Sequence, residues 1–190
     1  MASPRPAAMA SALLRVAAGI DRFSDGTGHL LSWLSLLMVL GTFLVVVLRC
    51  ALDMGWIGLQ EAVTYLHAAL FMLGAAYTLR QGGHVRIDIL YQRMSRRGRA
   101  WVDLAGTLLL LAPVCLFIAG IGWHYVAEAW AVREGSREAG GLPAVYLLKT
   151  LILIMPVLLL LQGLANALRN GLFLLGFEQA LPGEGSGPGG

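Results

Sequence analysis

Arg80 to Arg99, RQGGHVRIDILYQRMSRRGR, decides the fold, because this stretch places a dense cluster of positive charge between two long apolar runs. Six of its residues are arginines, namely Arg80, Arg86, Arg93, Arg96, Arg97 and Arg99. Short loops rich in Arg and Lys stay on the cytoplasmic side of a membrane, because positive charge near span ends sets orientation. The stretch is therefore predicted to be a cytoplasmic loop between two membrane spans.

Apolar residues recur within this basic loop at roughly helical spacing; they are Val85, Ile87, Leu90, Tyr91 and Met94. Such a pattern predicts a short helix in the headgroup layer, with its apolar face buried and its guanidinium groups among lipid phosphates. Four arginines are predicted as lipid-headgroup anchors: Arg93, Arg96, Arg97 and Arg99. An irregular, solvated basic loop is the alternative.

The composition is that of a membrane protein. Hydrophobic residues make up 57% of the chain and charged residues 13%, whereas a soluble domain carries about 25% charged residues. The net charge of +3 does not indicate a nucleic-acid partner, because the basic residues flank apolar runs. The two cysteines, Cys50 and Cys115, match neither a disulfide framework nor the spacing of a metal site.

Four apolar runs are long enough to cross the hydrocarbon core, which takes about twenty residues of helix. They cover residues 30–48, 62–79, 104–127 and 145–168. Within lipid, an open chain can satisfy its backbone polar groups only as helices. The predicted fold is therefore an all-α polytopic membrane protein, with a four-helix membrane domain at residues 28–175.

The two ends of the chain are predicted to lie outside the bilayer. In residues 1–27, apolar residues at steps of three and four predict an amphipathic helix on the inner membrane face before the first span. These residues are Met9, Leu13, Val16, Ile20 and Phe23. A signal peptide is the alternative, but Arg15 and Asp21 interrupt the apolar stretch and no clear cleavage site follows. Residues 176–190 are rich in Gly and Pro and are predicted to be a disordered cytoplasmic tail.

The distribution of basic residues predicts that both ends are cytoplasmic. Ten fall at the N-terminus, the central loop and the C-terminus: Arg5, Arg15, Arg22, the six loop arginines and Arg169. Four fall on the other side: Arg49, Arg133, Arg137 and Lys149. This bias follows the positive-inside rule and predicts an N-in, C-in topology.

The spans contain little that could perform chemistry, so no catalytic site and no cofactor are predicted. Apart from His67, no ionisable residue lies deep in a span, although substrate and ion pathways normally use such residues. Pro113 and Pro156 could mark a transport site in interrupted helices, or they could be tolerated kinks. His67 and His124 offer at most one haem-ligating pair. A stand-alone small transporter and a haem-bearing electron-transfer subunit are the alternative functions.

The second and fourth spans carry small and polar residues that would be costly against lipid. The second span has Gly74 among several alanines, together with His67, and the fourth has Gln162 and Asn166. Close packing of small residues and interhelical polar contacts drive helix association in lipid. Part of this surface would join the chain's own helices, and the excess is predicted to meet a larger membrane partner.

The segment Trp56 to Leu90, WIGLQEAVTYLHAALFMLGAAYTLRQGGHVRIDIL, resembles the small permease subunit (DctQ type) of TRAP transporters, the tripartite ATP-independent periplasmic carriers. The residues that fall on the family's pattern are Glu61, Tyr65, Gly74, His84, Val85, Ile87 and Asp88. Arg49 resembles an arginine at the end of the family's first helix, and Pro143 resembles a proline at the entry to its fourth. Three residues depart from the pattern: Gln60, Thr64 and Ala144.

The resemblance implies an accessory subunit of a multi-pass transporter in the bacterial inner membrane. In such a system a large permease subunit carries the substrate and sodium sites, and a periplasmic binding protein delivers a small organic acid. Glu61, Tyr65, His84, Arg86 and Asp88 are then candidates for contact with the permease. Helix capping and anchoring at the membrane interface are the alternative roles, because an acid near a helix N-terminus complements the helix dipole.

Overall fold

The computed structural model describes residues 4–83 and 93–177, and every regular element within these ranges is helical. The elements are α1 (Pro4–Leu52), α2 (Ile57–Arg80), α4 (Arg96–Gly106), the π-helical turn η1 (Thr107–Leu111), α5 (Ala112–Ala131) and α6 (Val145–Leu174). α4, η1 and α5 follow one another without a break. The described residues thus form four helices that are long and apolar enough to cross a membrane. This confirms the all-α, four-span prediction.

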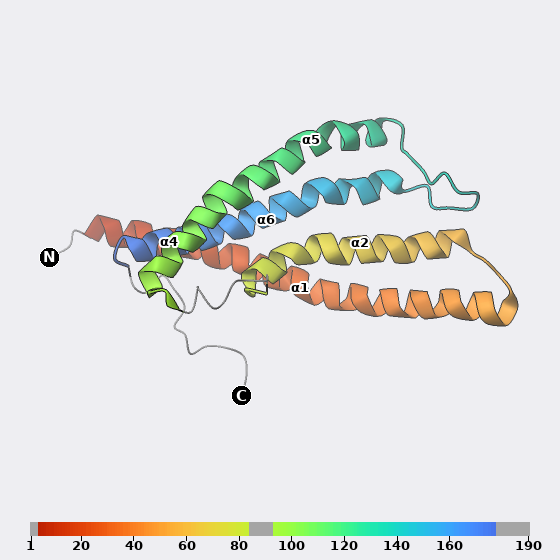
Figure 1. Cartoon of the computed structure of the whole chain (residues 1–190), viewed down its shortest axis with the longest axis horizontal. Helices are drawn as coiled ribbons and strands as arrows, with labels where there is room; N and C mark the ends of the chain where they lie inside the picture. Colours follow the sequence, from red (N-terminus) through yellow and green to blue (C-terminus); the bar gives the residue numbers. More distant parts are fainter. Residues whose placement is uncertain (1–3, 84–92, 178–190) are drawn as a thin grey trace.

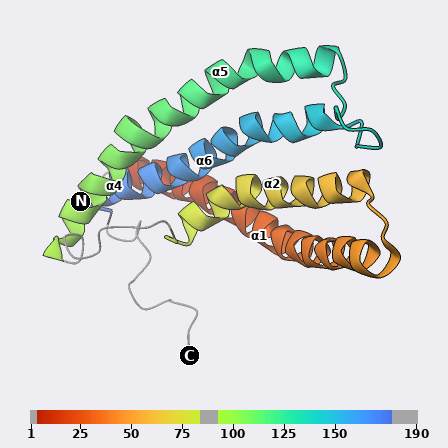
Figure 2. The same ribbon diagram turned by 45° about the vertical axis from the view of Figure 1, so that its right-hand side comes forward.

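The helices form an open layer with α6 and α2 inside it. Near the α1–α2 turn, the order across the layer is α5, α6, α2 and α1 (Figure 1), and the view turned by 45° shows the same order (Figure 2). α6 contacts α5 on one side and α2 on the other, and towards its C-terminal end it also contacts α1 and α4. The edge helices α1 and α5 therefore keep wide apolar faces exposed.

α1 is a single helix of 49 residues, about 74 Å long at a rise of 1.5 Å per residue. The amphipathic helix predicted near the N-terminus is present, but it is not a separate element, because it continues into the first span. Residues 24–28 contain two glycines and weak helix formers, which favour a break. Contacts with other helices override this preference, since Asp21, Ser24 and Asp25 all bind side chains of α2 or α6.

Residues at a seven-residue spacing hold α1 against its neighbours. The buried stripe consists of Ala10, Ala17, Ser24 and Leu31. A seven-residue period keeps one stripe facing the partner as two helices cross, and small side chains let the backbones approach closely. Met9, Val16 and Phe23, on the face that was predicted to be apolar, are exposed. That face is therefore available to lipid.

The third span contains a π-helical turn immediately before Pro113. The Ala112 N–H donates to the Thr107 carbonyl, five residues earlier. Pro113 has no N–H and its ring crowds the preceding turn, so the wider π turn relieves that conflict. Gly163 of α6 packs against this turn, where an added Cβ would lie 2.6 Å from Leu111 Cδ2. α6 and η1 approach closely because position 163 has no side chain. This packing agrees with the interpretation of Pro113 as a tolerated kink.

α2 ends in a Schellman motif. Gly82 has a φ of +66°, and the Gly83 N–H donates to the Thr78 carbonyl at 3.0 Å. Glycine adopts this left-handed conformation without the conflict that a Cβ would cause. The motif ends α2 directly after Arg80, which leaves this side chain beside α1, and Gly176 ends α6 in the same way.

The helix predicted in the basic loop falls mainly on residues 84–92. These residues, which include the candidates His84, Arg86 and Asp88, lie outside the described residues. In the described part, α4 begins at Arg96, and the hydroxyl of its N-cap residue Ser95 accepts from the Gly98 N–H at 3.2 Å. α4 then continues into the third span. From Arg96 onward, this segment therefore belongs to a long tilted helix (Figure 1).

Candidate functional site

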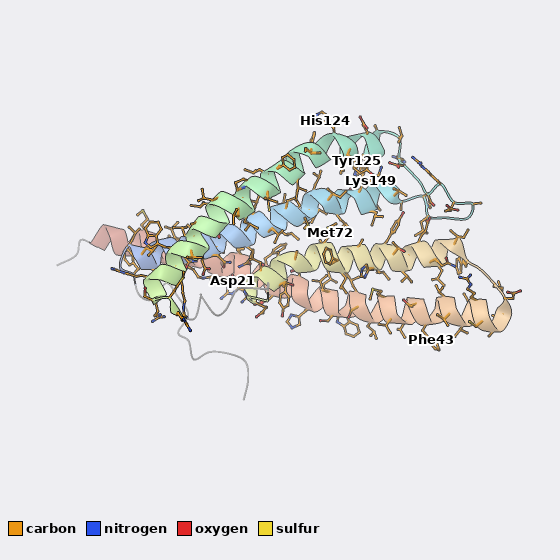
Figure 3. All side chains as sticks on the ribbon, in the orientation of Figure 1. Asp21, Phe43, Met72, His124, Tyr125 and Lys149 are labelled. Carbon is orange, nitrogen blue, oxygen red and sulfur yellow. The ribbon has the colours of Figure 1, made fainter. Side chains whose placement is uncertain are left out.

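Polar side chains of the described residues gather in two networks near opposite ends of α6. The α1–α6 network consists of Asp21, Ser24, Asp25, Arg80, Gln162 and Arg169. The loop network consists of Glu61, Glu134, Ser136, Leu142 and Lys149, and it ties the loop of residues 132–144 to α2 and α6. Figure 3 labels Asp21 in the first network and Lys149 in the second.

Gln162 is the buried centre of the α1–α6 network. Its side chain is fully buried, and its Oε1 accepts from the Ser24 hydroxyl at 2.7 Å. Its Nε2 donates to Asp21 Oδ1 at 3.1 Å. Both ends of the amide are thus satisfied by α1, which avoids the cost of a buried polar group without a partner.

Asp21 joins three helices by charge. Its carboxylate forms an ion pair with Arg169 of α6, and its Oδ1 lies 3.6 Å from Arg80 Nε at the end of α2. Arg80 also pairs with Asp25, one helical turn further along α1. The Asp21 and Arg169 side chains are only 17% and 18% exposed. Two acids therefore balance two arginines in a site with little water, where breaking one pair leaves another charge without compensation.

Sequence reasoning did not find this network. Asp21 was expected on an amphipathic helix of residues 8–23 at the inner membrane face, Asp25 was given no role, and Arg80 and Arg169 were used only as markers of orientation. A signal was present, because Ser24 continues the seven-residue series of Ala10 and Ala17, and Asp21 and Asp25 lie within one helical turn of it. Gln162, one of the candidates for a partner interface, is covered by α1 within this chain.

Glu61 is the centre of the loop network. Its carboxylate accepts from the Ser136 hydroxyl and, at 2.6 Å, from the Leu142 N–H. Gly141 lies between these groups, and an added Cβ there would come within 2.8 Å of Glu61 Oε2. The preceding residue, Gly140, has a φ of +82°. Two glycines therefore let the loop fold over the carboxylate of α2.

An aromatic ring lies against the ion pair of the loop network, and two further aromatic side chains join α5 to α6. Lys149 Nζ lies 2.5 Å from Glu134 Oε2 and 3.9 Å from the centre of the Tyr125 ring. Figure 3 shows Tyr125 and Lys149 close together where α5 meets α6. Trp130 packs edge-on against Tyr146 and donates through its Nε1 to Thr150 Oγ1 at 2.8 Å. These contacts hold the ends of α5 and α6 together.

Helix capping, one of the alternative roles for Glu61, does not fit the observed start of α2. α2 begins at Ile57, earlier than the predicted residue 62, so Glu61 lies beyond the first turn. Its carboxylate is instead directed to the loop of residues 132–144. Tyr65 lies one turn further along α2, and its buried hydroxyl has no hydrogen-bond partner among the described residues.

The other predicted interface residues are spread over the molecule. Arg49, His67 and Pro143 are exposed, and Asn166 is partly buried. Gly74 lies in the contact between α2 and α1, where an added Cβ would be 3.5 Å from Leu31. The structure does not bring these residues into one site. The headgroup candidates Arg93, Arg96 and Arg97 are exposed, while Arg99 is partly buried and has a contact of its own.

The two histidines of the haem alternative do not face each other within this chain. His67 lies on α2 and His124 on α5, on opposite sides of α6 (Figures 1 and 2). Figure 3 shows His124 on the side of α5 that points away from α6. In residues 4–83 and 93–177, no group of three or more His, Cys, Asp or Glu side chains could hold a metal ion.

Comparison with protein families matches residues 38–171 to "Tripartite ATP-independent periplasmic transporters, DctQ component". This chain belongs to the DctQ family. The match includes the loop network together with Arg80, Gln162 and Arg169, but it starts after Asp21 and Asp25. The chain is thus the small membrane component of a TRAP transporter, and its family is one of transporter components rather than enzymes. A search of curated proteins and a search of solved structures gave no match.

Proposed function

We propose that this DctQ-family chain supports the large permease subunit during sodium-coupled uptake of a small organic acid, which a periplasmic binding protein delivers. The bacterial inner membrane is the proposed location. The observation that carries the proposal is the position of the charges. Arg80 and Arg169 lie near the ends of α2 and α6, while Asp21 and Asp25 lie within α1, before its apolar run of residues 30–48. No Asp, Glu, Lys or Arg lies in the middle of an apolar run. A carrier of ions or anions normally places such groups deep in the membrane.

The edges of the helix layer support an accessory role. On α1, Trp33, Leu37 and Phe43 are exposed, and Figure 3 shows Phe43 on the side of α1 away from α2. On α5, Leu109 and Phe117 are exposed in the same way. Lipid or the helices of a larger subunit can cover these apolar edges. The charged groups of the two networks, in contrast, hold the chain's own helices together.

Reconstitution of uptake tests this proposal. Proteoliposomes would contain this chain, the large permease, or both, and each preparation would receive the binding protein, substrate and a sodium gradient. We expect uptake only when both membrane subunits are present. Uptake by this chain alone would establish a stand-alone transporter, and full uptake by the permease alone would contradict the supporting role. Replacing the sodium gradient with a potassium gradient tests the coupling ion, since the proposal requires loss of uptake.

The proposed orientation places the N-terminus, α4 and the C-terminal tail in the cytoplasm. Thiol labelling in a Cys50→Ser variant tests this orientation. The remaining native cysteine, Cys115, is buried and should not react. Ala139→Cys in the outer loop should react with a membrane-impermeant thiol reagent in cells with a permeable outer membrane. Arg97→Cys should react only after the inner membrane is opened. Ala139 is preferable to Gly140, whose φ of +82° disfavours a side chain. The opposite labelling pattern would overturn the proposed topology.

A further inference from the structure

The start of α4 and the residues just before it carry a cluster of four arginines, here called the α4 patch, which Asp103 follows in the sequence. Residues 93–102, RMSRRGRAWV, contain four arginines and no acidic residue. Arg93, Arg96 and Arg97 are all exposed. By contrast, the exposed arginines of the opposite loop, Arg133 and Arg137, alternate with Glu134 and Glu138. Arg93 and Arg97 are thus exposed and have no acidic residue within four positions in the sequence, so an anion can approach them.

One arginine of the α4 patch is held by α6. The Arg96 guanidinium carbon lies 5.8 Å from the centre of the Phe173 ring, a distance at which the face of an aromatic ring attracts a cation. Arg96 also lies near the last turn of α6, where the helix dipole favours positive charge. Arg93 and Arg97 therefore remain as the exposed guanidinium groups that can bind a ligand.

An apolar stripe continues from the arginines along the same face of the helix. Residues four and eleven positions apart lie on one side of a helix, so Arg97, Trp101 and Leu108 are aligned. Trp101 is 61% exposed and Leu108 is 55% exposed. At 1.5 Å per residue, Trp101 lies about 6 Å and Leu108 about 16 Å along the axis from Arg97. The stripe thus passes from charge through an aromatic ring to aliphatic surface.

We propose that the α4 patch is a binding site for an anionic phospholipid. Arg93 and Arg97 bind the phosphate of the headgroup, and one acyl chain lies along Trp101 and Leu108. Guanidinium groups suit this role because their planar N–H pairs match phosphate oxygens. A zwitterionic headgroup would bring its own positively charged amine close to these arginines. It should therefore bind more weakly than an anionic headgroup. The proposal concerns this chain alone and does not depend on the proposed role beside the permease.

Fluorescence quenching in lipid nanodiscs tests the site. The purified full chain would be placed in phosphatidylcholine nanodiscs with increasing amounts of phosphatidylglycerol that carries brominated acyl chains. A Trp101→Phe variant identifies the part of the quenching that belongs to Trp101. We expect the quenching of Trp101 fluorescence to saturate at a lower fraction of brominated phosphatidylglycerol than of brominated phosphatidylcholine. Equal quenching by the two lipids would overturn the proposal, because it would show ordinary contact with the bilayer.

A charge variant and a matched control isolate the arginines. Arg93→Gln/Arg97→Gln should weaken the apparent affinity for phosphatidylglycerol about 30-fold, from the contribution of each arginine near an anionic surface. Arg133→Gln/Arg137→Gln removes the same charge from the opposite loop and should leave the affinity unchanged. Unchanged binding in the first variant, or an equal loss in both, would contradict the site.

Inorganic phosphate should not displace the lipid; displacement would show a site for free phosphate instead. Circular dichroism of both variants verifies that the helices are retained.

Discussion

Asp21→Ala is expected to destabilise the purified chain by about 2–4 kcal/mol, because it leaves Arg169 without this ion-pair partner and the Gln162 Nε2 without its acceptor in a largely buried site. Asp21 is the one side chain of the α1–α6 network that contacts both of these residues and also Arg80. Denaturant unfolding in detergent would measure the loss. Hydrogen exchange should show the N-terminal part of α1 opening, while residues 38–52, which contact α2, keep their protection.

Two variants separate the parts of this effect. Asp25→Ala removes an acid from the same helix, but that side chain is 41% exposed and binds Arg80 alone. Its cost should remain below about 1 kcal/mol, as for other surface pairs. Asp21→Asn keeps an acceptor for Gln162 and loses the ion pairs, so it should lie between the two alanine variants. Equal effects of Asp21→Ala and Asp25→Ala would contradict a central role for Asp21.

The four spans were predictable because each is encoded locally. A run of nineteen residues without a charge, such as residues 30–48, is long enough to cross the hydrocarbon core as a helix. The sequence of the run itself therefore indicates a membrane span. The continuity of α1 was not predictable in the same way. Local propensity at residues 24–28 favours a break, and the contacts that override it come from residues far along the chain. Ser24 and Gln162, for example, are separated by 138 positions.

The candidate residues were predictable only in part. The resemblance to the DctQ family singled out Glu61 as a candidate for contact with the permease, whereas the contacts that the structure gives its carboxylate are within this chain, at residues 136 and 142. Gln162 was recognised as too polar for lipid, yet its burial against Ser24 depends on how α1 crosses α6. Pro113 indicated a kink. The π turn that accommodates it, and its contact with Gly163, depend on three-dimensional packing.

The two networks explain how an open layer of helices can keep its shape. A closed bundle buries its side chains around a common axis, whereas here most apolar side chains on α1 and α5 remain exposed. Apolar contact with a neighbouring helix replaces similar contact with lipid, so it provides little drive for association. Polar contacts near both ends of α6 therefore carry much of the specificity. The α1–α6 network fixes the position of α1, and the loop network fixes the long loop over α2.

Glu61→Ala is expected to release the loop of residues 132–144 from α2. The Leu142 N–H would lose its acceptor, and the Ser136 hydroxyl would lose its acceptor as well. We expect roughly tenfold faster amide exchange at Leu142, because a donor that loses a charged acceptor is no longer protected. Hydrogen exchange followed by mass spectrometry of peptides from residues 132–147 would measure this change.

The matched control for this prediction is Glu138→Ala, which removes the same charge from an exposed position in the same loop and should leave the exchange of Leu142 unchanged. Glu61→Gln keeps one acceptor oxygen and should give an intermediate rate. Co-purification with the permease then distinguishes the remaining interpretations of Glu61. If Glu61→Ala abolished assembly while Leu142 kept its protection, the carboxylate would act through the partner and not through the loop. Since the structure satisfies Glu61 within the chain, we expect the loop to open first and any loss of assembly to follow from it.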